Sequence, residues 1–299
     1  MIDQVTLNFN QSSVWILNII LAIIMFGIAL DLKISRFRSV VENPKALLVG
    51  LGTQWIMLPL LTLALIGIFK PLPSMALGMI VVACCPGGNI SNFISAICKA
   101  DVELSIVLTT ISSVGAVILT PALFNFYGSI YPDTNNILQQ INLDWLEVAK
   151  AICLIIIVPI ILGKLTSSYF PQLSNKIMIP LRYLSMLLFL LIVIGALMIN
   201  GSYFLEYIDE VFGLVLVHNG AAFIGAFAIA TIFKLKKNEI KTVTIETGIQ
   251  NSGLGLLIIF SFFSGLGGMA IVAAWWGIWH IVSGFALSFF WRREKTINN

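Results

Sequence analysis

Two stretches of the sequence decide the fold. Residues 84–92 read Cys-Cys-Pro-Gly-Gly-Asn-Ile-Ser-Asn, and residues 246–253 read Glu-Thr-Gly-Ile-Gln-Asn-Ser-Gly. Each lies near the middle of an apolar run that is long enough to cross a membrane. Proline removes a backbone donor and glycine weakens a helix, so we expect both helices to be interrupted there. Because freed backbone groups cannot face lipid, both interruptions should lie against protein or a wet cavity.

The composition around these stretches is that of a membrane protein. Of the 299 residues, 59% are hydrophobic and only 10% are charged. A soluble domain carries about 25% charged residues, so this chain cannot build a water-facing surface. That excludes a soluble enzyme, a nucleic-acid-binding module and a disordered chain. We therefore expect the lipid bilayer, and no nucleic acid, as a partner.

The apolar runs predict nine membrane-spanning helices of about 20 residues or more each. They are expected at 13–31, 46–69, 74–99, 103–127, 145–166, 177–199, 210–233, 239–263 and 268–291. With this division, all but Lys70 and Lys150 of the 17 Lys and Arg residues fall on one side. Acidic residues such as Asp133 and Asp144 mark the other side. Since basic residues favour the cytoplasm, the N-terminus is predicted outside and the C-terminus inside.

The two interrupted runs predict an internal repeat. By this topology, run 74–99 passes inward and run 239–263 passes outward, a pairing typical of inverted-repeat transporters. Run 74–99 is the third of the first four runs, and run 239–263 is the fourth of the last five. The two halves of the chain therefore align if the first half lacks a leading helix. The predicted fold is an all-α polytopic membrane protein with a 4+5 inverted-topology repeat, whose broken helices cross at mid-membrane.

Glu246 is the candidate centre of the chemistry, because no other acidic residue lies near the middle of a predicted span. A carboxylate at that depth is costly unless it is paired or neutralised. No Lys or Arg is expected at the same depth, so its partner should be a cation from outside or a proton. A structural hydrogen bond to a neighbouring helix is the other interpretation. Oxygen-bearing side chains are expected nearby, namely Gln54, Ser91, Asn92, Ser105, Thr109, Gln250 and Asn251. Such ligands suit a hard cation and not zinc or copper.

Three motifs together resemble the bile acid:sodium symporter (BASS/SBF) family. They are C-C-P-G-G-x-x-S-N at 84–92, L-S-x-x-x-T-T at 104–110 and E-x-G-x-Q-N-S-G at 246–253. The resemblance covers nearly the whole chain. It implies a core domain and a panel domain, with this chain similar to the variant that lacks the first panel helix. The panel would then comprise 13–31 and 145–199, and the core 46–127 and 210–291.

The resemblance also implies the binding residues. A first sodium site would use Ser91, Asn92, Ser105, Thr109 and Glu246. A second would use Gln54, Glu246 and Gln250 with the backbone carbonyls of Thr247 and Ile249. Substrate would lie in the core–panel cleft near Asn89, Asn251 and His280. Two positions depart from the family pattern, because Asn89 stands where many relatives have Thr and Ile281 follows His280 where we expect Asn.

The predicted function is a sodium-coupled secondary active symporter in the inner or plasma membrane. It would import an organic anion, either bile acid-like or a small carboxylate such as pantoate, by alternating access. Its partners would be sodium ions and that anion, with no cofactor beyond sodium as the coupling ion and no enzymatic activity. The alternatives are a proton-coupled exporter of the same superfamily, of the arsenite or auxin type, and a non-transporting membrane sensor. An intramembrane serine hydrolase built on Ser252 and His280 is a further alternative.

Overall fold

The structure is a computed structural model that describes residues 2–4, 6–7, 11–30, 40, 42 and 44–293 of the chain. This described part is helical and contains no β-strand, only two isolated bridges. Its elements in chain order are η1 (Ile2–Gln4), α1 (Gln11–Leu30), α3 (Pro44–Gly52), η2 (Thr53–Met57), α4 (Leu58–Phe69), α5 (Pro73–Ala83), α6 (Ile90–Ile97), α7 (Val102–Gly128), α8 (Pro132–Ile141), α9 (Trp145–Tyr169), α10 (Pro171–Ile199), α11 (Gly201–Ile232), α12 (Lys237–Gly248), α13 (Ser252–Phe262) and α14 (Gly267–Arg293).

The fold class is confirmed as all-α, and the protein is a multi-pass membrane protein. Within the described residues, six helical segments are long and apolar enough to cross a bilayer. They are Ser12–Leu30, Pro44–Phe69, Val102–Gly128, Trp145–Tyr169, Gly201–Ile232 and Gly267–Trp291. The apolar helices α5 and α13 are shorter, because each is one half of an interrupted helix.

Both expected interruptions are present. The predicted run 74–99 forms α5 and α6, which are separated by residues 84–89. The predicted run 239–263 forms α12 and α13, which are separated by residues 249–251. The apolar halves α5 and α13 are buried over most of their length, so neighbouring helices enclose the interruptions as the lipid environment requires.

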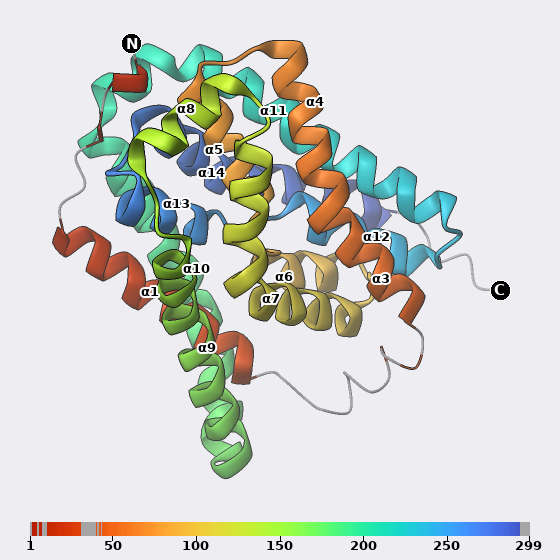
Figure 1. Cartoon of the computed structure of the whole chain (residues 1–299). Coiled ribbons are helices and arrows are strands. Elements are labelled where there is room, and N and C mark those ends of the chain that lie inside the picture. The colour runs from red at the N-terminus through yellow and green to blue at the C-terminus, as the bar shows by residue number, and fades with distance from the viewer. Residues whose placement is uncertain are drawn as a thin grey trace.

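Two groups of helices pack around these interruptions. Helix α1 lies along α9 and α10, and these three extend together on one side of the molecule (Figure 1). On the other side, α14 packs against α5, α13 and α11, while α12 packs against α11 and α7. The interrupted helices therefore lie between α7, which follows the first of them, and α11 and α14, which flank the second.

Three features of the described chain were not predicted. Residues Thr53–Met57 form a π-helical turn inside the helix Pro44–Phe69, and α8 is a short helix after α7. Helix α11 begins at Gly201, nine residues before the predicted run, because polar residues interrupt an apolar run but do not end a helix.

Among the basic residues used for the predicted orientation, Lys33, Arg36, Arg38 and Lys295 lie outside the described residues.

Candidate functional site

The two interruptions meet and satisfy each other's backbone groups. Gly87 and Gln250 form an isolated antiparallel bridge. The N–H of Gly88 donates to the carbonyl of Ile249 at 2.7 Å, and the N–H of Asn251 donates to the carbonyl of Pro86 at 2.8 Å. Unwound backbone in a membrane protein must find partners inside the protein, and here each interruption supplies them for the other.

Hydroxyl groups of α7 form hydrogen bonds with backbone groups of the first interruption. Thr120 donates to the carbonyl of Cys84 at 2.8 Å, and the N–H of Gly87 donates to the Ser112 hydroxyl at 3.3 Å. These roles of Ser112 and Thr120 were not predicted from the sequence. The i, i+4, i+7 spacing of Ser105, Thr109 and Ser112 on one helix face is the signal that could have indicated Ser112.

We call the place where the two interruptions are hydrogen-bonded to each other the crossing. Glu246 is fully buried beside it and is enclosed by hydroxyl donors. Ser91 donates to its Oε1 atom at 2.5 Å, and Ser105 donates to the same oxygen. Thr109 lies 3.0 Å from both carboxylate oxygens. The carboxylate is thus held by the first turn of α6 and by one face of α7, at the place where α12 nears its end.

Asn92 completes this group, which we call the Glu246 cluster: Ser91, Asn92, Ser105, Thr109 and Glu246. The side-chain oxygen of Asn92 accepts hydrogen bonds from Ser105 at 2.8 Å and from Thr109 at 3.4 Å. The structure therefore brings together all five residues predicted for the first sodium site. Their oxygens are carboxylate, amide and hydroxyl groups, which are ligands for a hard cation.

The residues predicted for the second sodium site also lie at the crossing. A Cβ atom built on Gly87 would lie 2.6 Å from Oε2 of Glu246 and 3.5 Å from Nε2 of Gln54, so both side chains approach the same point. Gln250 donates from Nε2 to the carbonyl of Thr247 at 2.8 Å. Gln54 comes from the π-helical turn, a feature that often occurs at functional sites.

The amide oxygens of this second group are free to bind a ligand. Oε1 of Gln54 and Oε1 of Gln250 are buried, and neither has a hydrogen-bond partner within the described residues. An unpaired buried polar atom costs about 1–3 kcal/mol, so native proteins seldom leave one without a functional reason. A cation bound between these oxygens and Glu246 would remove that cost.

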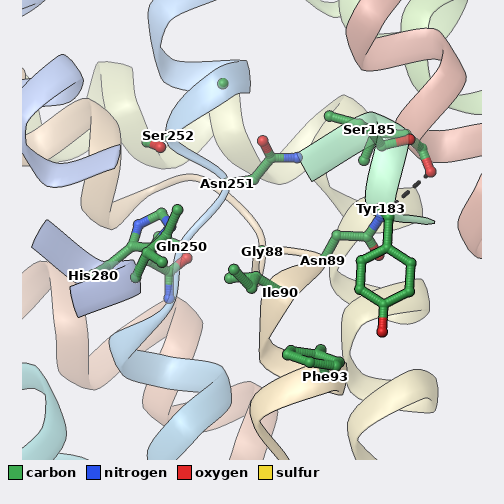
Figure 2. A pocket seen from close by; sticks show the side chains of 13 residues that line it. Gly88, Asn89, Ile90, Phe93, Tyr183, Ser185, Gln250, Asn251, Ser252 and His280 are labelled. Atoms are coloured by element: carbon green, nitrogen blue, oxygen red, sulfur yellow. Dashed lines mark hydrogen bonds between the residues drawn. The ribbon is translucent and has the colours of Figure 1, made fainter. Parts of the chain in front are cut away.

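A cavity adjoins the crossing, between α1 and α10 on one side and α6, α13 and α14 on the other. Figure 2 shows its walls, to which both interruptions contribute. The three predicted substrate residues, Asn89, Asn251 and His280, all line it. Phe93, Tyr183 and Ser185 line it as well and were not predicted; the α10 residues carry no motif that distinguishes them from lipid-facing positions.

The predicted substrate residues keep some polar groups available in this cavity. Nδ1 of His280 has no hydrogen-bond partner within the described residues. Asn251 uses its side-chain oxygen to cap α13, at 3.1 Å from the N–H of Leu254, and Asn89 donates to the carbonyl of Ile24 at 3.4 Å (Figure 2). Ser252 also lines the cavity, but its hydroxyl makes no hydrogen bond to His280. The pairing that a serine hydrolase needs is therefore not formed.

Comparison with known proteins assigns the family. Residues 18–207 match the sequence model of the Sodium Bile acid symporter family. The chain belongs to this family. The family prediction made from the three motifs is confirmed, and the family is one of transporters.

The relatives extend the similarity beyond the matched residues. An uncharacterized sodium-dependent transporter of Bacillus subtilis, YocS, is 30% identical over 296 residues, which cover 96% of this chain and 87% of that protein. A probable chloroplastic sodium/metabolite cotransporter of rice, BASS2, is 27% identical over 92% of this chain, which spans 63% of its length. The human ileal sodium/bile acid cotransporter is 26% identical over 82% of this chain and 68% of its own. Relatives of this symporter family are thus sodium-coupled transporters, which supports the same general function here.

Proposed function

We propose that this protein is a sodium-coupled secondary active symporter that imports an organic anion by alternating access. One observation carries the proposal: a buried carboxylate, Glu246, lies at the crossing of two interrupted helices and beside a cavity. Burying an unneutralised carboxylate at this depth costs several kcal/mol. A sodium ion at the cluster would neutralise it.

Two cations share this carboxylate in the proposal. The first would bind at the Glu246 cluster, and the second would bind between Gln54, Gln250, Glu246 and the carbonyls of Thr247 and Ile249. The observations that support this division are the hydroxyl donors on Oε1 and the position of Oε2 and of the Gln54 side chain around Gly87. Because both interruptions contribute ligands, cation binding would hold the crossing in one arrangement and so define the neighbouring cavity.

The substrate would occupy the cavity beside the crossing. Its lining combines apolar side chains such as Phe93 with the amides of Asn89 and Asn251, and none of the described lining residues is Lys or Arg. A carboxylate would therefore be bound by neutral donors. Ser252 and Gly253, the first residues of α13, also line the cavity, and the N-terminus of a helix favours an anion.

The proposed architecture has nine spans, with the N-terminus outside, the C-terminus in the cytoplasm and a 4+5 inverted repeat, in the plasma or inner membrane. Helices α1, α9 and α10 would form the panel, and residues 46–127 and 210–291 the core; the packing of α1 along α9 and α10 supports this. The core would move against the panel to alternate access. Inward movement of sodium gains about 2.3 kcal/mol per charge for every 100 mV of membrane potential. No cofactor and no covalent step are required.

Uptake into proteoliposomes tests the proposal. The purified protein is reconstituted, and the uptake of a labelled bile acid, pantoate or a keto acid is followed with external sodium or with potassium or choline in its place. We expect uptake of at least one anion class only in sodium, and faster uptake with the interior negative. Uptake that persists without sodium and follows a pH gradient would contradict sodium coupling and favour the proton-coupled exporter.

A further inference from the structure

Asn219 on α11 holds the interruption between α12 and α13. Its side chain is fully buried, and Nδ2 donates to the carbonyl of Gly248 at 2.7 Å. Gly248 is the last residue of α12, and the N–H four residues later, that of Ser252, donates to the carbonyl of Gln250 instead. The Gly248 carbonyl is therefore an orphan of the helix end, and Asn219 satisfies it.

This carbonyl lies between the two that the proposed second sodium site uses. Thr247 precedes Gly248 and Ile249 follows it, with Ile249 in an extended conformation. Because a peptide unit is planar, fixing the Gly248 carbonyl also fixes the N–H of Ile249 and the direction in which the chain continues. The carbonyls of Thr247 and Ile249 accept one hydrogen bond each, from Gln250 and from the N–H of Gly88, and each keeps a second lone pair for a cation.

A second residue of α11 fixes the same point. Phe223 lies one helical turn after Asn219, on the same face of α11. A Cβ atom at Gly248 would lie 2.2 Å from Cε1 of Phe223, so only glycine fits beneath the ring. Helix α11 thus holds Gly248 by one hydrogen bond and one close packing contact.

Ser283 on α14 fixes the orientation of the Asn219 amide. Its hydroxyl donates to Oδ1 of Asn219 at 2.6 Å, so the amide nitrogen must face Gly248. Ser283 lies three residues after His280, which lines the cavity. The contact therefore links the α12–α13 interruption to the helix that carries one wall of the substrate cavity.

We propose that Asn219, oriented by Ser283, is a positioning residue for the second sodium site, because it turns the Gly248 carbonyl away and presents those of Thr247 and Ile249. The inference rests on the proposed sodium-coupled function. A merely structural asparagine would stabilise the protein equally with and without sodium. A positioning residue changes the sodium dependence itself.

The test measures the sodium concentration that gives half of the sodium-induced thermal stabilisation of the full-length protein, with potassium keeping the ionic strength constant. Ser283→Ala, which frees the amide to rotate, should raise that concentration about fivefold, and Asn219→Leu about tenfold or more. Ser283→Thr, which keeps the hydroxyl, should restore it to within about twofold. Ser288→Ala is the matched control on α14, because its hydroxyl donates only to the carbonyl of Phe285, and it should change nothing. The sodium-free melting temperature of Ser283→Ala should fall only modestly, because Oδ1 of Asn219 loses its partner while the fold is otherwise unchanged.

Double substitutions assign the effect to one cation site. Combined with Gln54→Leu, which removes a ligand of the second site, Asn219→Leu should cause no further loss of sodium affinity. Combined with Ser105→Ala, which damages the first site, the two effects should multiply. Multiplication in both pairs, or a wild-type sodium response in both Ser283→Ala and Asn219→Leu, would overturn the inference. A wild-type protein that shows no sodium response would instead overturn the proposed function.

Discussion

The N–H of Gly88 and the carbonyl of Ile249 form a 2.7 Å hydrogen bond that joins the two interrupted helices where each is broken. Glu246 lies three residues before Ile249 on one helix, and Ser91 lies three residues after Gly88 on the other, 2.5 Å from the carboxylate. Proposed cation ligands and parts of the cavity wall therefore lie on two segments that are hydrogen-bonded to each other. We expect a change at one interruption to affect the other through these buried hydrogen bonds.

The hydroxyl of Ser105 should contribute to sodium binding, because it contacts both Glu246 and Asn92. We predict that Ser105→Ala raises the half-saturating sodium concentration about tenfold, the size expected for a lost hydrogen bond to a charged group. Ser113→Ala is the matched control on α7, since Ser113 is equally buried but its hydroxyl has no hydrogen-bond partner among the residues that the structure describes. Thermal stabilisation by sodium measures both variants. Equal sodium responses in the two would remove Ser105 from the site.

Gln54 should be needed for the second cation but not for folding. Both of its amide atoms are buried without a hydrogen-bond partner in the described protein, so Gln54→Leu removes unpaired polar groups. We predict an unchanged or higher melting temperature without sodium, together with a sodium titration that is less steep than that of the wild type. A steepness equal to that of the wild type would show that Gln54 does not bind a cation.

Gly87 should tolerate no side chain, because a Cβ atom there would lie 2.6 Å from Oε2 of Glu246. Gly87→Ala must displace the carboxylate, and we predict loss of sodium-dependent stabilisation. The control is Gly220→Ala on α11, where nothing lies within 4 Å of the added atom and helix propensity rises. A Gly87→Ala protein that binds sodium as the wild type does would contradict the placement of Glu246 over this glycine.

The cavity and the cation sites should be separable by substitution. Ser185 on α10 lines the cavity but belongs to neither proposed cation site, so Ser185→Phe should fill the space that substrate needs. We predict a fall in sodium-driven uptake of about tenfold, with the sodium response in thermal unfolding within about twofold of the wild type. Ser168→Phe, at an exposed position on α9, is the control. Full uptake by Ser185→Phe would place the substrate elsewhere.

The sequence predicted the parts of this molecule that depend on local pattern. Apolar length located the helices, and Pro86 with its following glycines located the first interruption, because these residues act on their own backbone. The oxygen-bearing residues around Glu246 were predicted because a buried carboxylate needs polar partners.

The features that were missed depend on contacts between distant segments. Thr120 on α7 satisfies the carbonyl of Cys84, and Asn219 satisfies that of Gly248, but neither role can be inferred before the helices are packed. Tyr183 and Ser185 lie in an otherwise apolar run and belong to no motif, so the packing of α10 beside the crossing identifies them. Helix α8, with Thr134 bonded to the carbonyl of Gly128, is too short and polar to register as an apolar run.

The binding of radioactive sodium-22 to the purified protein tests the central claim most directly. The comparison is between the wild type, Glu246→Gln and Glu147→Gln, the last being the same substitution at an exposed carboxylate on α9. We predict saturable binding that is retained in Glu147→Gln and lost in Glu246→Gln, because the amide keeps the shape of the side chain but not its charge. Saturable binding of equal affinity in Glu246→Gln and the wild type would contradict the claim that this buried carboxylate holds the coupling ion.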